Sequence, residues 1–136
     1  MTNTTAQSAD VIAVRSGFEA IARGDLAGFG EMFHPDATWN HRNDDRLGGV
    51  HAGRDGILAF IGESVQLTAG TLRPVPRVFM TDGEGHVAVL TQVSGTRPDG
   101  RSFDNPQMLL FRVVDGRVRS VDQFVGDPVA VKAFWA

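Results

Sequence analysis

The sequence of 136 residues contains no cysteine, which excludes disulfide bonds and thiolate metal sites. It has no apolar run that could span a membrane and no N-terminal apolar segment of signal-peptide length, so we expect a cytoplasmic protein. Thirteen basic residues against sixteen acidic ones give a net charge of −3, which gives nucleic acid no electrostatic reason to bind. Phosphate loops, dinucleotide fingerprints and the G-x-S-x-G element are also missing. The four histidines do not form a ligand cluster, so we expect neither a metal nor an organic cofactor.

Apolar residues are plentiful by contrast. They make up 42% of the chain and include nine phenylalanines, enough to build one hydrophobic core. The length fits one domain, which we place at residues 8–136. Residues 1–7 are polar, and we expect them to form a disordered tail.

Helical spacing dominates the first part of the chain. Apolar residues at intervals of three and four predict a helix over residues 8–21, with Ser8 as its N-cap and Gly24 just beyond its end. Gly17 lies inside this helix, where glycine costs about 1 kcal/mol relative to alanine. Either the helix tolerates it, or another part of the chain approaches closely there.

The next segment changes from helix to strand and back. A short helix begins at Asp25 and ends before Pro35, which cannot continue it. Residues 37–41 then predict a strand, and residues 42–52 a polar loop of the kind that forms the rim or lid of a site. A further helix is expected over residues 53–68, with Phe60 off the centre of its main apolar stripe.

From residue 72 the apolar period changes to two, which indicates strands. Four such segments occur, at residues 72–80, 86–96, 102–114 and 117–125. Pro74 and Pro76 in the first favour an edge position or a bulge, and Asp115-Gly116 predicts a tight hairpin between the last two. Asp127-Pro128 starts a final helix. Helices first and strands last predict an α+β fold, in which a long, twisted antiparallel sheet wraps around the helices and leaves a pocket.

Four pieces of the chain resemble the SnoaL-like and ketosteroid-isomerase-like group of the nuclear-transport-factor-like superfamily. They are GDLAGFGEMFHPDATW, HAGRDGILAF, LLFRVVDGRV and FVGDP, in the order expected of that group. The resemblance implies a cone-shaped α+β barrel with a strongly curved sheet, an internal apolar cavity and a homodimer formed through the sheet.

The catalytic residues of the isomerase branch do not carry over. That branch uses an aspartate base and an oxyanion hole made of a tyrosine and a protonated aspartate. The resemblance places Gly17 at the tyrosine position, Leu109 at the protonated aspartate and His41 at the base. Steroid isomerisation by that mechanism is therefore not expected.

The epoxide-hydrolase branch needs an Asp-Arg-Asp set, which is missing as well. Gln123 falls near the closing carboxylate, and Val93 and Gly95 fall near the other two positions. SnoaL-like cyclases use acid–base residues inside the cavity, and His41 is the one residue here that the resemblance places in such a position.

His41 is the candidate catalytic residue. Side chains alternate along a strand, so Ala37, Trp39 and His41 share one face. A histidine has an unperturbed pKa of ~6.5 and exchanges protons near neutral pH. The alternative is a histidine at the pocket mouth that only hydrogen-bonds the following loop.

Three amides are candidates for orienting a substrate oxygen. Asn105, Gln107 and Leu109 share one strand face, and buried amides require hydrogen-bond partners. The start of that strand could instead be exposed, with a turn or bulge at residues 105–106. On the last strand Gln123 is expected to face the cavity, although a one-residue bulge would place Asp122 there instead. The apolar wall is expected from Trp39, Phe60, Val89, Thr91 and Val93, each of which core packing would also explain.

These observations leave three functions open. The first is cofactor-free acid–base chemistry on a small apolar carbonyl compound, of the polyketide cyclase or isomerase type. The second is a non-catalytic binding module with the same cavity, and the third is a dimerisation or docking domain whose cavity is filled. An empty apolar pocket of several hundred cubic ångströms would favour the first two. A homodimer is expected through the outer sheet face, which carries Ala88, Leu90 and residues 108–110.

Overall fold

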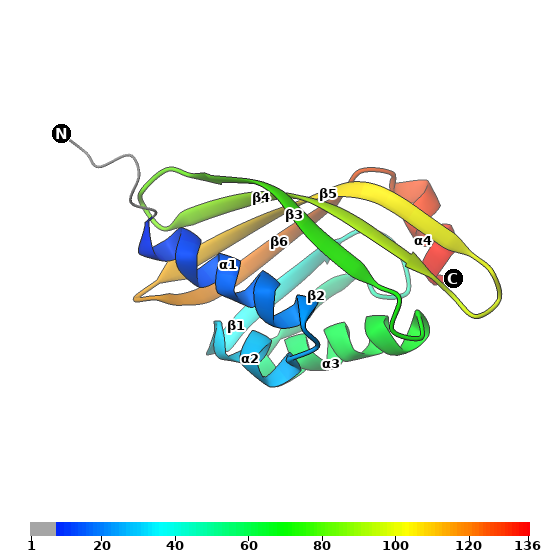
Figure 1. Cartoon of the computed structure of the whole chain (residues 1–136), viewed down its shortest axis with the longest axis horizontal. Coiled ribbons are helices and arrows are strands. Elements are labelled where there is room, and N and C mark those ends of the chain that lie inside the picture. The colour runs from blue at the N-terminus through cyan, green and yellow to red at the C-terminus, as the bar shows by residue number, and fades with distance from the viewer. Residues whose placement is uncertain (1–7) are drawn as a thin grey trace.

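The computed structural model contains one curved sheet of six strands (Figure 1). It describes residues 8–136, and the tail predicted over residues 1–7 lies outside the described residues. The elements in chain order are α1 (Ala9–Ala22), α2 (Leu26–Glu31), β1 (Phe33–Arg42), β2 (Gly49–Ala52), α3 (Gly53–Leu67), β3 (Arg73–Thr81), β4 (His86–Thr96), β5 (Ser102–Val114), β6 (Arg117–Val125) and α4 (Pro128–Trp135). The strand order is β2-β1-β6-β5-β4-β3, and the sheet is not closed. The predicted α+β cone is confirmed.

The last three strands, β4 to β6, have the predicted bounds, and β3 is shifted by one residue from the predicted 72–80. β4, β5 and β6 pair antiparallel, and the β5–β6 turn has positive φ at both Asp115 (52°) and Gly116 (79°), as a tight hairpin turn requires. β3 is an edge strand, and its register to β4 shifts between Pro76 and Val78. One pairing differs from the expected antiparallel sheet, because β1 runs parallel to β6.

The helices cover one side of the sheet. Figure 1 shows α1, α2 and α3 on the concave side, with α4 beside the far end of β5. Ser8 caps α1 by accepting a hydrogen bond from the backbone N–H of Val11, and Asp25 caps α2 in the same way from Gly28. Within residues 8–136, no helix is long and apolar enough to span a membrane.

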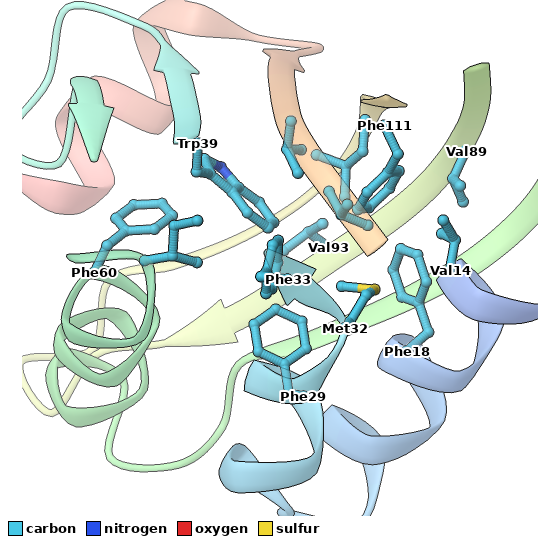
Figure 2. Close-up of a cluster of buried hydrophobic side chains, with 14 of the residues drawn as sticks. Val14, Phe18, Phe29, Met32, Phe33, Trp39, Phe60, Val89, Val93 and Phe111 are labelled. Carbon is cyan, nitrogen blue, oxygen red and sulfur yellow. The ribbon is translucent and has the colours of Figure 1, made fainter. Parts of the chain in front are cut away.

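Side chains from the helices and the sheet meet in an aromatic core. In Figure 2, Val14 and Phe18 of α1 point toward Val89 and Phe111 of the sheet, while Phe29, Met32 and Phe33 fill the space between α2 and Trp39. Phe18 packs edge-on against Phe111, and Phe29 packs edge-on against Phe33. Aromatic pairs of this kind add stability beyond their buried area.

The structure corrects three details of the sequence prediction. β1 begins at Phe33, so Pro35 lies within the strand. It falls where the register between β1 and β6 shifts, between Phe33 and Thr38, so the backbone N–H that proline lacks is not needed for pairing there. The predicted loop over residues 42–52 contains β2, which pairs with β1. Phe60 is 6% exposed and lies at the centre of the buried face of α3, since it packs between Trp39 and His51.

Gly17 is a point of close approach. A Cβ atom at this position would lie 2.3 Å from the Sδ atom of Met32. Of the two readings that the sequence left open, the structure supports the close approach of another segment.

Candidate functional site

A cavity of about 560 Å³ lies between the concave side of the sheet and the helices. Its wall is mostly apolar and includes Phe18, Phe29, Met32, Trp39, Phe60 and Leu109. Exposed residues such as Leu26, Arg73 and Val75 form its mouth, while the buried His41 and Gln107 lie at its inner end. The cavity is thus apolar along its length and polar at its inner end.

His41 occupies the inner end as the strand alternation predicts. Ala37, Trp39 and His41 are all buried on the concave face of β1, and the His41 residue is 2% exposed. The imidazole Nδ1 lies 2.9 Å from Oε1 of Gln123, and Nε2 lies 2.8 Å from Oδ2 of Asp45. Both ring nitrogens are therefore engaged by other side chains.

The predicted amides on β5 and β6 form a connected chain that reaches Trp39 and His41 on β1. Gln123 accepts a hydrogen bond from Nε1–H of Trp39 at 2.8 Å and donates one from Nε2 to Oε1 of Gln107 at 2.6 Å. Gln107 in turn donates to Oδ1 of Asn105 at 3.3 Å. Because β1, β6 and β5 are neighbours in the sheet, the chain joins residues that are far apart in sequence. Asp122 points away from the cavity and pairs with Arg42.

Asp45 is the site residue that sequence reasoning missed. Its side chain is fully buried although it lies in the loop after β1. Burial alone would raise the pKa of Asp45, but hydrogen bonds from His41, Asn43 and the backbone N–H of Leu47, with the charge of His41, hold that pKa below its ordinary value. Its i, i+4 spacing from His41 is a weak signal, because outside a helix this spacing does not bring two side chains together.

Aromatic stacking holds the wall beside His41. Phe60 stacks on the ring of His51 at 4.1 Å between centroids and packs against Trp39 at 5.7 Å and His41 at 5.9 Å. His51 is itself fixed by donating from Nε2 to the carbonyl oxygen of Leu47 at 2.8 Å. Phe60 therefore connects α3 to the site.

The structure brings most of the predicted site residues to the cavity. Those that line it are His41, Trp39, Phe60, Val93, Gln107, Leu109 and Gln123. Val89, Thr91 and Asn105 are buried but do not line it. Thr91 is the cross-strand partner of the longer Gln107, and Asn105 lies behind Gln107 as its acceptor.

Charge at the cavity is sparse. Among residues 8–136, Arg73 at the mouth and His41 at the inner end are the titratable residues of the lining itself, and Asp45 is hydrogen-bonded to His41 behind it. The described part of the chain contains no group of three histidine or carboxylate side chains placed to hold a metal ion. The arrangement offers hydrogen bonds and one titratable ring to a bound molecule.

Comparison with known proteins identifies the class of this fold and cavity. Residues 14–121 match the model of the SnoaL-like domain, so the chain belongs to the SnoaL-like family, as the sequence predicts. An uncharacterised protein of Mycobacterium tuberculosis is 31% identical over 128 residues, covering 94% of this chain and 97% of that protein.

Two solved structures show the same fold. Bal32a, from a soil-derived mobile gene cassette, matches with a TM-score of 0.90 and 27% identity over 94% of this chain and 97% of its own. TerC, co-crystallised with polyporic acid, matches with a TM-score of 0.82 and 24% identity over 93% of this chain and 98% of its own.

Proposed function

We propose that this protein binds a small apolar molecule with a carbonyl or hydroxyl oxygen in the cavity and performs cofactor-free acid–base chemistry on it. The reaction would be of the polyketide cyclase or isomerase type. His41 is the proposed acid–base group, and Gln107 and Gln123 are proposed to position the oxygen.

One observation carries the proposal: an apolar cavity of about 560 Å³ whose polar groups converge at its inner end. Small-molecule sites are typically concave, apolar and supplied with a few well-placed polar groups. A domain with a filled cavity would not have this space. The ligand in the TerC complex is a precedent for small-molecule binding in this fold.

A non-catalytic binding module is the second candidate. The observation that favours it is the engagement of both His41 ring nitrogens by Gln123 and Asp45. In that case His41 would only complete the lining, and a ligand would bind without turnover.

The experiment that tests the proposal measures binding and proton exchange separately, with 2-tetralone as the probe. Trp39 and Trp135 both line the cavity, so we expect the probe to change the intrinsic fluorescence in a saturable way. Deuterium exchange at the acidic carbon of the probe, followed by NMR, then reports proton chemistry. We expect His41→Ala to slow this exchange by about 10²–10⁴-fold, as for loss of a general acid or base, with binding nearly unchanged.

The control is His86→Ala, because His86 lies on the surface in a pair with Asp82. It should change neither signal. If the probe binds but exchanges no faster than in solvent alone, the protein is the non-catalytic binding module. If neither 2-tetralone nor other bicyclic ketones change the fluorescence in a saturable way, the proposed ligand cavity is refuted.

We also propose a homodimer through the outer face of the sheet. Val78, Leu90, Met108 and Phe124 are cross-strand neighbours in one row over β3, β4, β5 and β6, and none of them is buried. A contiguous apolar row of this kind is typical of an interface. Light scattering at micromolar concentration should give twice the chain mass, and Leu90→Glu should give the monomer. The matched control is Val129→Glu, on the exposed face of α4 away from the row; a monomeric wild type would refute the proposal.

A further inference from the structure

The carboxylate of Asp45 receives three hydrogen bonds in a place that water does not reach. His41 Nε2 and Asn43 Nδ2 lie 2.8 and 2.7 Å from Oδ2, and the backbone N–H of Leu47 donates to Oδ1 at 2.8 Å. Three donors converge on an acceptor whose side chain is 0% exposed. This is the environment of an ionised carboxylate, which accepts hydrogen bonds and donates none.

The orientation of the Gln123 amide is set by Trp39. An indole N–H can only donate, so the Gln123 atom 2.8 Å from Trp39 Nε1 must be the carbonyl oxygen. The same oxygen lies 2.9 Å from His41 Nδ1. The amide nitrogen is turned to Gln107 Oε1, at 2.6 Å. Gln123 therefore offers His41 an acceptor and cannot offer it a donor.

The two ring nitrogens of His41 thus both face oxygen acceptors. A neutral imidazole has one N–H and one lone pair, and either tautomer would turn that lone pair toward an oxygen within 2.9 Å. We propose that His41 rests as a doubly protonated imidazolium, with Asp45 as the positioning residue that holds it so at the inner end of the cavity.

The other charged groups on neighbouring elements do not compete for the ring. On β6, Asp122 faces away and pairs with Arg42, and on α3, Glu63 pairs with Arg46 at the surface. His51 of β2 donates to the Leu47 carbonyl and stacks on Phe60 instead. On α4, Lys132 pairs with the exposed Asp44. Within residues 8–136, Asp45 is the charged group in contact with His41.

This inference deepens the proposed function and rests on it only for the direction of the chemistry. An imidazolium gives a proton before it takes one. A ligand oxygen that replaces Gln123 Oε1 beside Nδ1 would receive the Nδ1 proton. The neutral ring would keep its Nε2–H on Asp45 and would then be ready to accept a proton from a ligand carbon. His41 would thus act first as an acid, in contrast to the base position that the family resemblance implies for it.

The test is NMR of the ¹⁵N-labelled, ligand-free protein at pH 7, with His41→Gln used to assign the ring signals. We expect both ring nitrogens of His41 to carry a hydrogen, and Asp45→Asn to remove one of the two. The matched control is Asp82→Asn, because Asp82 forms the same i, i+4 pair with His86 at 2.7 Å on the surface. It should leave the His41 signals unchanged.

A singly protonated His41 in the wild type at pH 7 would overturn the proposal, and so would an Asp45→Asn spectrum that keeps both ring hydrogens. If Asp45→Asn does not fold, the wild-type spectrum decides alone. The NMR test uses no ligand, so a negative result would not bear on whether 2-tetralone binds. Equally, a lack of 2-tetralone binding would not bear on the protonation state of His41.

Discussion

Replacing Gln123 with leucine is the sharpest test of the polar network at the inner end of the cavity. Leucine has a similar size and no polar atoms. The substitution removes the partner of three groups, which are Nε1–H of Trp39, Nδ1 of His41 and Oε1 of Gln107. The shape of the site is largely kept, so the measured change reports the hydrogen bonds.

The expected loss follows from these three groups. An unsatisfied buried polar group costs about 1–3 kcal/mol, and we take the lower value of about 1 kcal/mol for each because the cavity admits water. The three together cost about 3 kcal/mol, and burial of the leucine side chain offsets about 1 kcal/mol of this. The free energy of unfolding should therefore fall by about 2 kcal/mol, which for a chain of this length lowers Tm by about 6–10 °C.

The assay is urea denaturation followed by far-ultraviolet circular dichroism, which does not depend on Trp39. The matched control is Gln92→Leu, since Gln92 makes a single exposed hydrogen bond to Asp104 at 2.7 Å. Surface changes of this kind stay within about 0.5 kcal/mol. If the two leucine variants lose equal stability, the network contributes nothing and the reasoning is refuted.

Two further variants test other parts of the site. The pKa of Asp45 is lowered in the folded state, so the ionised carboxylate stabilises the fold above the pKa of an unfolded aspartate, ~3.9, and this stabilisation is lost as pH falls through the folded pKa. In urea titrations at a series of pH values, Asp45→Asn should therefore lose less stability than the wild type below about pH 4. An unchanged loss of stability in acid would contradict this. Gly17→Ala should push Met32 into the cavity and weaken 2-tetralone binding, while the gain in helix propensity, about 1 kcal/mol, offsets the strain. Gly56→Ala on α3 is the control and should leave binding unchanged, because a Cβ there has no neighbour closer than 3.8 Å and Gly56 does not line the cavity.

The sequence predicted best those elements whose signals are local. The bounds of β4, β5 and β6 were predictable because alternation of apolar residues and turn pairs such as Asp115-Gly116 both act over a few residues. β2 was missed because Gly49–Ala52 has no pattern of its own and is a strand only through its pairing with β1. Pro35 appeared to be a boundary because the register shift that accommodates it depends on the distant β6.

The site divides in the same way. His41, Gln107 and Gln123 could be assigned to the cavity from alternation along single strands. Asp45 could not, because its position depends on how the loop after β1 folds back, with Asn43 and Leu47 as partners. Phe60 was correctly expected in the cavity wall but was placed off the centre of the apolar stripe of α3, because helical spacing allows a broad stripe.

The parallel pairing of β1 with β6 has a consequence for the order of folding. The hydrogen bonds from Trp39 and His41 to Gln123 close loops of 84 and 82 residues, among the longest separations between hydrogen-bonded side chains in the chain. Closing so long a loop carries an entropic cost, which is smaller once the intervening hairpins β3–β4 and β4–β5 have shortened the flexible part of the loop. The inner end of the cavity is therefore assembled only when the last strand docks. A chain in which β1 and β6 are not yet paired lacks this part of the cavity, so a ligand that binds there stabilises only the state in which the two strands are paired.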